Sequence, residues 1–318
     1  MKQPVQSNYP ETRGDKNLLR RLADYTEIST KIASVFPFFV TLGYCFFQGY
    51  VINVKGSALF FLAMLFFDMT VTMMNNYSEF CETKKRRYFS RPLMVALIIC
   101  GAVFSACIGL YLSRVCGYAF FLAGVFCFGV GIAYSFGPAP ISKSPYGELF
   151  SAFTMGFVLP FLVMTINAPP LAVFYIDRLD VIIRFDLPGM LRLVLVCAPL
   201  MLCIANIMLA NNIRDMETDK NSRYTMARHI GRENAVRLFA ALYGLVYPAI
   251  IAAVFLGAIP GFCLLVLVTV IPVFRNIRRF RNEQPKPEAF RLSIRNHIII
   301  LAPYTVCLFL GGVFAFFR

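Results

Sequence analysis

Acidic and amide side chains stand at helical spacing near the end of the second apolar stretch of the chain. The segment FFDMTVTMMNNYSEFCE carries Asp68, Thr72, Asn75, Glu79 and Glu82 at intervals of four, three, four and three residues. Such intervals place side chains on one face of a helix. Because an acid inside an apolar helix is costly in hydrocarbon, we expect Asp68 to face a polar interior or a partner. The alternative is a hydrogen-bonded packing acid between helices.

A second acidic segment, ANNIRDMETDKNSRYTMARHIGRE, follows another apolar stretch. Asp215 and Asp219 are four residues apart, so on a helix they would project from one face about 6 Å apart. Two carboxylates at this spacing can share a divalent cation with hard oxygen ligands, although solvated loop charge would give the same pair. The same pattern occurs in both segments: an Asn, here Asn211, is followed by spaced acids and then by basic residues. This repetition favours a cation-binding site over solvated loop charge.

A third polar segment, AYSFGPAPISKSPYGELF at residues 133–150, is dense in Gly and Pro. These residues interrupt helices and form turns, so we predict a loop that caps a cavity. Tyr134 and Ser135 supply hydroxyls, Lys143 a cation and Glu148 a further carboxylate. We interpret the segment as functional, because an ordinary connecting loop is usually shorter and less polar.

Facing carboxylates with nearby Lys or Arg are what diphosphate chemistry requires. Mg²⁺ takes few protein carboxylates and completes its octahedron with water and phosphate oxygens. The metal and cationic side chains then stabilise the charge on departing pyrophosphate. The candidate cations are Lys143, Arg214, Arg223 and Arg228, and the last of these fits a membrane-surface anchor equally well.

The elements that must position these residues are membrane helices. Of 318 residues, 58% are hydrophobic and 15% are charged, and the mean hydropathy is +0.65. We predict an all-α integral membrane fold, because transmembrane strands would alternate in polarity over about 10 residues. Nine apolar stretches are expected to cross the ~30 Å hydrocarbon layer, at approximately 31–53, 57–78, 92–113, 116–136, 149–175, 189–211, 235–257, 260–275 and 297–317.

The formal charge of +14 is distributed along the chain in a way that indicates membrane orientation and not a nucleic-acid site. With the N-terminus inside, far more Lys and Arg lie inside than outside, where we find Lys55, Arg114, Arg178, Arg184 and Arg318. The positive-inside rule therefore predicts N-in, C-out topology, with all three polar segments on the inner face. Residues 1–29 are predicted to be a cytoplasmic leader, with either a short interfacial helix or a disordered segment before residue 30, and residues 30–318 a single transmembrane domain.

The polar segments resemble those of the UbiA superfamily of membrane prenyltransferases. NNIRDMETD followed by RYTMARHIG resembles the second aspartate-rich motif of that family. YSFGPAPISKSPYGELF is similar to the loop after helix four in the MenA-like branch, which prenylates 1,4-dihydroxy-2-naphthoate. NNYSEFCE lies where the first motif, NDxxDxxxD, belongs: Asn75 fits, Asn76 and Glu79 replace Asp, and Thr83 takes the last acidic position. The resemblance covers residues 30–318 and implies a nine-helix UbiA-type bundle.

The resemblance implies Mg²⁺-dependent transfer of a prenyl group from a prenyl diphosphate to an aromatic acceptor. The expected acceptor is 1,4-dihydroxy-2-naphthoate in menaquinone synthesis, with 4-hydroxybenzoate or another phenolic compound as the alternative. The expected setting is a bacterial plasma membrane with the active side facing the cytoplasm, without nucleic acid. Residues and resemblance together predict metal ligands Asn75, Glu79, Asn211, Asp215 and Asp219, diphosphate contacts Lys31, Tyr134, Ser135, Lys143, Arg214 and Arg223, and catalytic roles for Asp68, Tyr134, Lys143 and Arg223.

Other classes of membrane protein fit the polar pattern less well. A secondary transporter would place polar residues near the midplane of several helices, whereas these acids cluster at the inside ends. A CDP-alcohol phosphotransferase also uses Mg²⁺ and aspartates, but the expected Asp-Gly and second Asp-rich portion are missing from the sequence. A purely structural protein has no need of paired carboxylates at matching depths.

Overall fold

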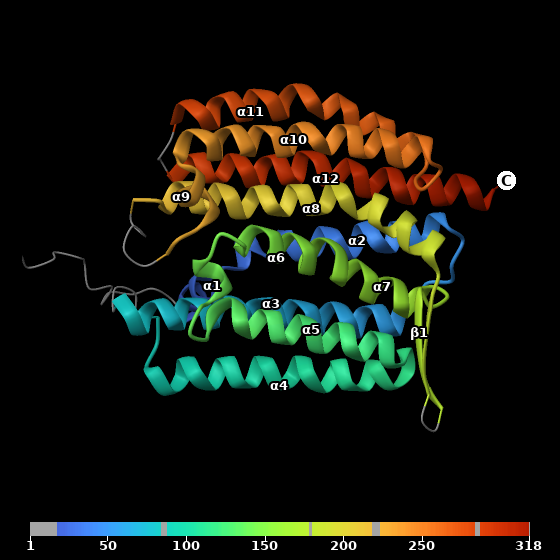
Figure 1. The fold of residues 1–318 in the computed structure, drawn as a ribbon, viewed down its shortest axis with the longest axis horizontal. Helices are drawn as coiled ribbons and strands as arrows, with labels where there is room; N and C mark the ends of the chain where they lie inside the picture. The colour runs from blue at the N-terminus through green and yellow to red at the C-terminus, as the bar shows by residue number, and fades with distance from the viewer. Residues whose placement is uncertain (1–17, 84–87, 178–179, 218–222, 284–286, 318) are drawn as a thin grey trace, which may run out of the picture.

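The computed structural model describes residues 18–83, 88–177, 180–217, 223–283 and 287–317, and nearly all regular structure within them is helical (Figure 1). The helices are α1 (Leu18–Thr26), η1 (Ile28–Thr30), α2 (Ile32–Phe47), α3 (Val54–Thr83), α4 (Arg91–Cys116), α5 (Tyr118–Ser135), η2 (Ile141–Lys143), α6 (Gly147–Phe153), η3 (Thr154–Val158), α7 (Leu159–Asn167), α8 (Leu187–Asp215), α9 (Met226–Ile230), α10 (Arg232–Phe255), η4 (Gly261–Thr269), α11 (Val270–Glu283) and α12 (Pro287–Phe316).

Eight helical stretches in the described part of the chain are long and apolar enough to cross a membrane. The first predicted crossing corresponds to α2, which has 16 residues and covers about 24 Å at the α-helical rise. That length is shorter than the ~30 Å hydrocarbon layer. The structure is therefore an all-helical membrane bundle with eight candidate spans and one shorter apolar helix.

A β-hairpin replaces the end of the predicted helix over 149–175, so that prediction was wrong beyond Asn167. β1 (Ala172–Asp177) and β2 (Asp180–Phe185) pair antiparallel, with Ala172 opposite Phe185. Pro169 and Pro170 cannot continue a helix, and the β-branched and aromatic residues that follow favour strands. The predicted loop at 133–150 also ends early, because α6 begins at Gly147.

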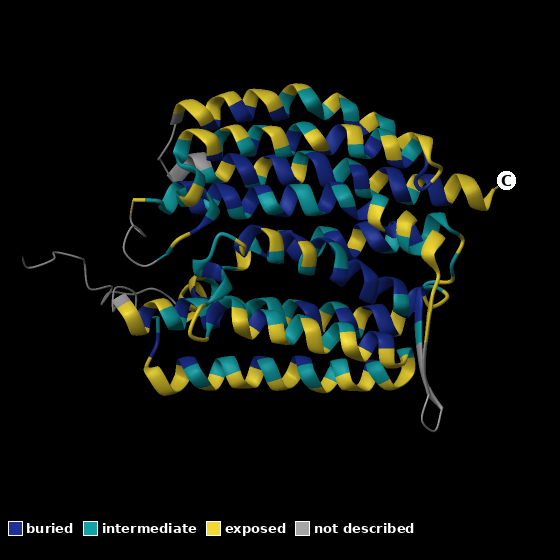
Figure 2. Ribbon diagram, in the orientation of Figure 1, coloured by how far each residue is buried: buried dark blue, intermediate teal, exposed yellow. Residues whose placement is uncertain are grey.

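Helix α8 occupies the centre of the bundle. The long helices run side by side along the longest axis of the molecule, and α8 packs against α6, α10 and α12 (Figure 1). Figure 2 shows α8 largely buried, whereas α4 at the bottom edge exposes much of its surface. Leu193, Val196, Leu200 and Ile204 are buried and follow one face of α8. This placement puts the polar C-terminal end of α8 in the middle of one end of the bundle.

A glycine lets α8 approach the single π-helical turn η3 closely. A Cβ added at Gly156 would lie 2.8 Å from Met201 Cγ and 2.9 Å from Met201 Cα. We expect Gly156→Ala to lower the free energy of unfolding by about 1–3 kcal/mol, because two backbones would have to separate. Gly109→Ala in α4 is the matched control, since no atom lies within 4 Å of its added Cβ. Thermal unfolding in detergent checks this, and equal melting temperatures for the two variants would contradict it.

Candidate active site

The three polar segments singled out from the sequence meet at one end of the bundle. The C-terminal ends of α3, α5 and α8 and the start of α6 lie at the same end, on the left of Figure 1. The segment after α8 contacts the loop between α5 and α6 directly, because the Tyr224 backbone N–H donates to the Lys143 carbonyl oxygen at 2.8 Å. Residues far apart in the sequence therefore share one region.

Two ion pairs join the acidic end of α3 to the other polar segments. Lys143 Nζ pairs with Glu82 Oε1. Arg223 Nη2 lies 3.6 Å from Glu79 Oε2, and the Arg223 side chain is only 14% exposed. Both cations are thus held at the end of α3 where a bound anion could exchange with the carboxylates.

A buried carboxylate lies at the start of α6, at the same end of the bundle. Glu148 is 8% exposed, and its Oε1 accepts a hydrogen bond from Asn212 Nδ2 at 2.8 Å. Its other oxygen has no hydrogen-bond partner among the described residues. Tyr134, near the C-terminal end of α5, lies close to the start of α6, because a Cβ added at Gly147 would be 3.8 Å from the Tyr134 hydroxyl. Because an unsatisfied buried oxygen is costly, Glu148 Oε2 is ready to accept a hydrogen bond from a ligand.

The second acidic motif forms a cluster at the end of α8. Arg214 Nε and Nη2 donate to Asp215 Oδ1 and Oδ2 at 2.7 Å and 2.6 Å. Nη2 also donates to Asn211 Oδ1 at 2.7 Å, and the guanidinium lies 4.7 Å from the centroid of the Phe290 ring. Three of the predicted residues are therefore together. The fourth predicted residue of this motif, Asp219, lies outside the described residues.

Asp68 and Lys31 form a separate polar cluster deeper in the bundle. Lys31 Nζ lies 2.8 Å from Asp68 Oδ1 and 2.5 Å from Thr72 Oγ1, and Ser34 Oγ donates to Asp68 Oδ2 at 2.7 Å. Asp68 precedes Glu79 by eleven residues, which is about 16 Å along α3. Asp68 thus has the polar partner expected of an acid in an apolar helix, and the structure does not join this pair to the ion pairs of Glu79 and Glu82.

Two further residues of the polar segments serve contacts within the fold. Ser135 is 1% exposed, and its hydroxyl donates to the Val71 carbonyl oxygen at 3.4 Å. Asn76, which stands where the first motif of the family has Asp, donates from Nδ2 to the Tyr25 carbonyl oxygen at 3.0 Å. Burial raises the pKa of the Tyr25 phenol, which therefore stays neutral. Asn76 fastens α1 to the end of α3.

Sequence reasoning gave too little weight to Glu148 and Asn212. Glu148 was noted only as a further carboxylate in a loop, and Asn212, which directly follows Asn211 in the sequence, was given no role. The signal was the doublet itself, because adjacent residues on a helix point about 100° apart and cannot both serve the same cluster. Asn211 contacts Arg214, whereas Asn212 contacts Glu148.

The oxygen atoms available at this end of the bundle are of the types that bind magnesium. Within the described ranges, no three or more His, Cys, Asp or Glu side chains form a group that could hold a metal ion. The donors present are carboxylate and amide oxygens, which are the hard ligands that Mg²⁺ takes, and substrate phosphate can complete its coordination. Each of the two carboxylates, Glu79 and Asp215, has an Arg as counter-ion. A diphosphate that carries its own magnesium would suit this mixture of acids and bases.

Comparison with known proteins decides the family. A sequence model of the UbiA prenyltransferase family matches residues 34–300. The chain belongs to the UbiA prenyltransferase family. It is therefore a membrane prenyltransferase, which confirms the enzyme class predicted from its motifs. The chain is also similar to the 1,4-dihydroxy-2-naphthoate octaprenyltransferase of Bacillus subtilis (strain 168), with 27% identity over 250 residues that make up 73% of this chain and 75% of the relative.

Solved structures share the fold. A UbiA homolog from Aeropyrum pernix K1 superposes with a TM-score of 0.61 at 17% identity, over 92% of this chain and 99% of that one. A UbiA homolog from Archaeoglobus fulgidus bound to GPP and Mg²⁺ superposes with a TM-score of 0.60 at 12% identity, over 91% and 99% of the two chains. The UbiA-type helical architecture expected from the motifs is confirmed.

Proposed function

We propose that this UbiA-family enzyme transfers a prenyl group from a prenyl diphosphate to 1,4-dihydroxy-2-naphthoate, as a step of menaquinone synthesis, with Mg²⁺ as cofactor. The observation that carries the proposal is the pairing of Arg223 with Glu79 and of Lys143 with Glu82, which brings three distant segments to one anion-binding end. The Bacillus subtilis relative bears the name of this reaction, and a UbiA homolog has been solved with GPP and Mg²⁺. 4-Hydroxybenzoate is the alternative acceptor.

Cationic side chains bind the diphosphate in this proposal. Lys143, Arg214 and Arg223 leave their carboxylates and donate to phosphate oxygens, where Arg can form two parallel hydrogen bonds. The Tyr134 hydroxyl supplies a further donor. When bound, magnesium supplies electrostatic stabilisation of the departing pyrophosphate. It would be held by Asn75, Glu79, Asn211, Asp215 and Asp219.

Glu148 is the acceptor-side residue in this proposal. Its free Oε2 accepts a hydrogen bond from a ring hydroxyl of the acceptor, which raises the electron density of the ring. The ring carbon forms the new bond to the allylic carbon as the bond from that carbon to the diphosphate oxygen breaks. Pyrophosphate takes the electron pair of that bond. By resemblance to the MenA-like branch, the naphthoate carboxyl leaves as carbon dioxide.

An apolar hollow offers room for the isoprenoid tail. It has a volume of about 320 Å³ and is lined only by apolar side chains, including Phe126, Phe153, Phe157 and Phe161. These residues lie on α5, α6, η3 and α7. Phe153 follows Glu148 by five residues, which is about 8 Å along the helix. A prenyl chain that starts at the ion pairs can therefore continue into this hollow.

The proposal places the site end in the cytoplasm of a bacterial cell. The predicted inside segments carry most of the Lys and Arg of the chain. With α2 counted as a crossing, the nine helical stretches give an N-in, C-out chain. Prenyl diphosphate and the aromatic acid then reach the site from the cytoplasm, and the prenylated product stays in the bilayer.

An assay with defined substrates tests the proposal. Membranes that contain the protein are incubated with prenyl diphosphates of several lengths and a panel of aromatic acids, and lipid-soluble products are identified by mass. We expect product with dihydroxynaphthoate, its loss to background after chelation of divalent metal, and its return when Mg²⁺ is added. Product from hydroxybenzoate alone would select the alternative acceptor, and metal-independent product would contradict the assignment of the acids.

A further inference from the structure

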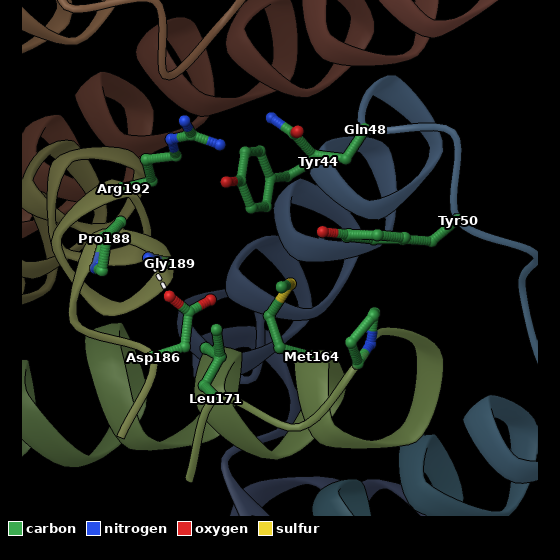
Figure 3. Close-up of a pocket in the computed structure, with 10 residues that line it drawn as sticks. Tyr44, Gln48, Tyr50, Met164, Leu171, Asp186, Pro188, Gly189 and Arg192 are labelled. Atoms are coloured by element: carbon green, nitrogen blue, oxygen red, sulfur yellow. Dashed lines mark hydrogen bonds between the residues drawn. The ribbon is translucent and has the colours of Figure 1, made fainter. Parts of the chain in front are cut away.

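A second cavity lies at the opposite end of the bundle from the ion pairs. Figure 3 shows this pocket, which has a volume of about 130 Å³ and is bordered by the end of α2, the end of α7 and the start of α8. The polar residues that line it are Tyr44, Gln48, Tyr50, Asp186 and Arg192. The prenyl-transfer site uses none of them.

Three helix ends meet around the pocket. Tyr44 and Gln48 lie at the C-terminal end of α2, and Tyr50 follows in the connection to α3. Arg192 lies in the first turns of α8, and Asp186 directly precedes this helix. Because the apolar span of α8 begins at Leu187, the pocket lies where a membrane-crossing helix starts, near the level of the lipid headgroups.

Several polar groups that face this space have no partner among the residues that the structure describes. Tyr44 is only 3% exposed, yet its hydroxyl makes no hydrogen bond to a described residue. The side chains of Gln48 and Arg192 likewise make no hydrogen bond or ion pair to the rest of the described chain. In Figure 3 the Tyr44 and Tyr50 hydroxyls and the Arg192 guanidinium point into the same space. These donors are arranged for a ligand that supplies acceptors.

The pocket carries one charge of each sign. Arg192 is the only charged residue in the sequence from Leu187 to Ile213. Asp186 lies on the opposite wall, and its Oδ1 caps α8 by accepting a hydrogen bond from the Gly189 N–H at 3.1 Å. A ligand that matches both walls has an anionic group and a cationic group a few bonds apart.

We propose that this pocket binds the headgroup of an aminophospholipid, a phosphodiester linked to a primary ammonium. The phosphodiester accepts hydrogen bonds from Arg192 and from the Tyr44 hydroxyl, because guanidinium matches phosphate geometry and a single cation balances its single charge. The ammonium lies against Asp186. The glycerol and acyl chains remain in the bilayer, since the pocket has room only for the polar group.

Native mass spectrometry of the purified full-length protein tests the proposal. The protein is reconstituted in nanodiscs of phosphatidylethanolamine, phosphatidylglycerol or phosphatidylcholine, and retained lipids are counted after release into detergent. We expect one tightly retained phosphatidylethanolamine per chain, retention of phosphatidylglycerol and phosphatidylcholine at several-fold lower occupancy, and no displacement by millimolar inorganic phosphate. Displacement by inorganic phosphate would assign the pocket to a soluble anion and overturn the lipid proposal.

Four variants separate the pocket from general effects on the fold. Arg192→Gln is expected to lower phosphatidylethanolamine retention about tenfold or more, because a charge-assisted hydrogen bond is lost. Tyr44→Phe keeps the packed ring and is expected to lower retention several-fold. Asp186→Asn keeps a helix-capping side chain and is expected to remove the preference for phosphatidylethanolamine over phosphatidylglycerol. Arg184→Gln, on the neighbouring strand β2, is the matched control and is expected to behave as the parent.

The outcomes decide the proposal independently of prenyl transfer. Equal retention by the parent, Arg192→Gln and Tyr44→Phe would overturn the site. Equal affinity of the parent for phosphatidylethanolamine and phosphatidylglycerol, unchanged in Asp186→Asn, would overturn the headgroup assignment. Monodisperse elution of every variant excludes misfolding as the cause of a loss.

Discussion

Replacing Asp215 by Asn is expected to lower the rate of prenyl transfer by about a hundredfold to a thousandfold, the effect of removing one stabiliser of developing charge. Asp215 stands at the end of the central helix α8 and holds a counter-ion, Arg214, by two hydrogen bonds. In the proposed function it gives up that counter-ion to the diphosphate and binds magnesium. The half-saturating Mg²⁺ concentration of residual activity, measured in membranes, should rise.

Arg214→Gln is the control that separates metal binding from a structural ion pair. If Asp215 only held Arg214 in place, both variants would show the same kinetic defect. We expect them to differ: Arg214→Gln should raise the KM for prenyl diphosphate and leave the Mg²⁺ dependence unchanged. Identical profiles for the two variants, or full activity of Asp215→Asn, would remove Asp215 from the metal site.

Replacing Lys31 by Met is expected to lower the free energy of unfolding by about 3–5 kcal/mol, because Asp68 would keep a buried charge without its cation. The side chains of Lys31 and Asp68 are only 7% and 18% exposed, so solvent screens the pair little. The double variant Lys31→Met with Asp68→Leu should recover most of the loss, since no isolated charge remains. Unfolding of the parent, the two single variants and the double variant in detergent gives the four free energies of this double-mutant cycle.

The same double variant tests the prediction that Asp68 is catalytic. Both carboxylate oxygens of Asp68 are occupied, by Lys31 and by Ser34. We therefore expect a positioning role, in which the pair holds α2 against α3, and we expect the stable double variant to retain measurable prenyl transfer. A double variant that is as stable as the parent but inactive would support a catalytic Asp68 and contradict the positioning role. Ser34→Ala, which removes one hydrogen bond and no charge, is the mild control.

The sequence predicted the parts of the fold that depend on local pattern. Long apolar stretches indicated membrane helices because length and hydropathy alone determine whether a helix can cross the bilayer. The hairpin at Ala172–Phe185 was missed because its apolar residues continued the hydropathy of the preceding helix, so the effect of Pro169 and Pro170 went unnoticed. The short length of α2 was missed for a related reason, since Gln48 and Gly49 barely interrupt an apolar run.

The candidate site was predictable as a set of segments but not as a set of contacts. Motifs such as NNIRDMETD are contiguous, so their resemblance to a family can be seen without the fold. The partners of individual side chains depend on packing between distant helices. Lys31 and Asp68 are 37 residues apart, and Glu148 and Asn212 are 64 apart. The pattern of one segment carries no information about which of several cations will reach its acid.

The hydrogen bond from Asn76 to the Tyr25 carbonyl gives the unusual first motif a structural meaning. An aspartate at position 76 would present a negative oxygen to that carbonyl, and the two acceptors would repel each other. The Asn76 amide therefore holds α1 against the end of α3 that bears Glu79. The carboxylate of the family motif that this segment resembles is absent at this position. If α1 moved away from α3, this hydrogen bond would break and the end of α3 would lose a support. The position of α1 thus influences the orientation of the Glu79 side chain.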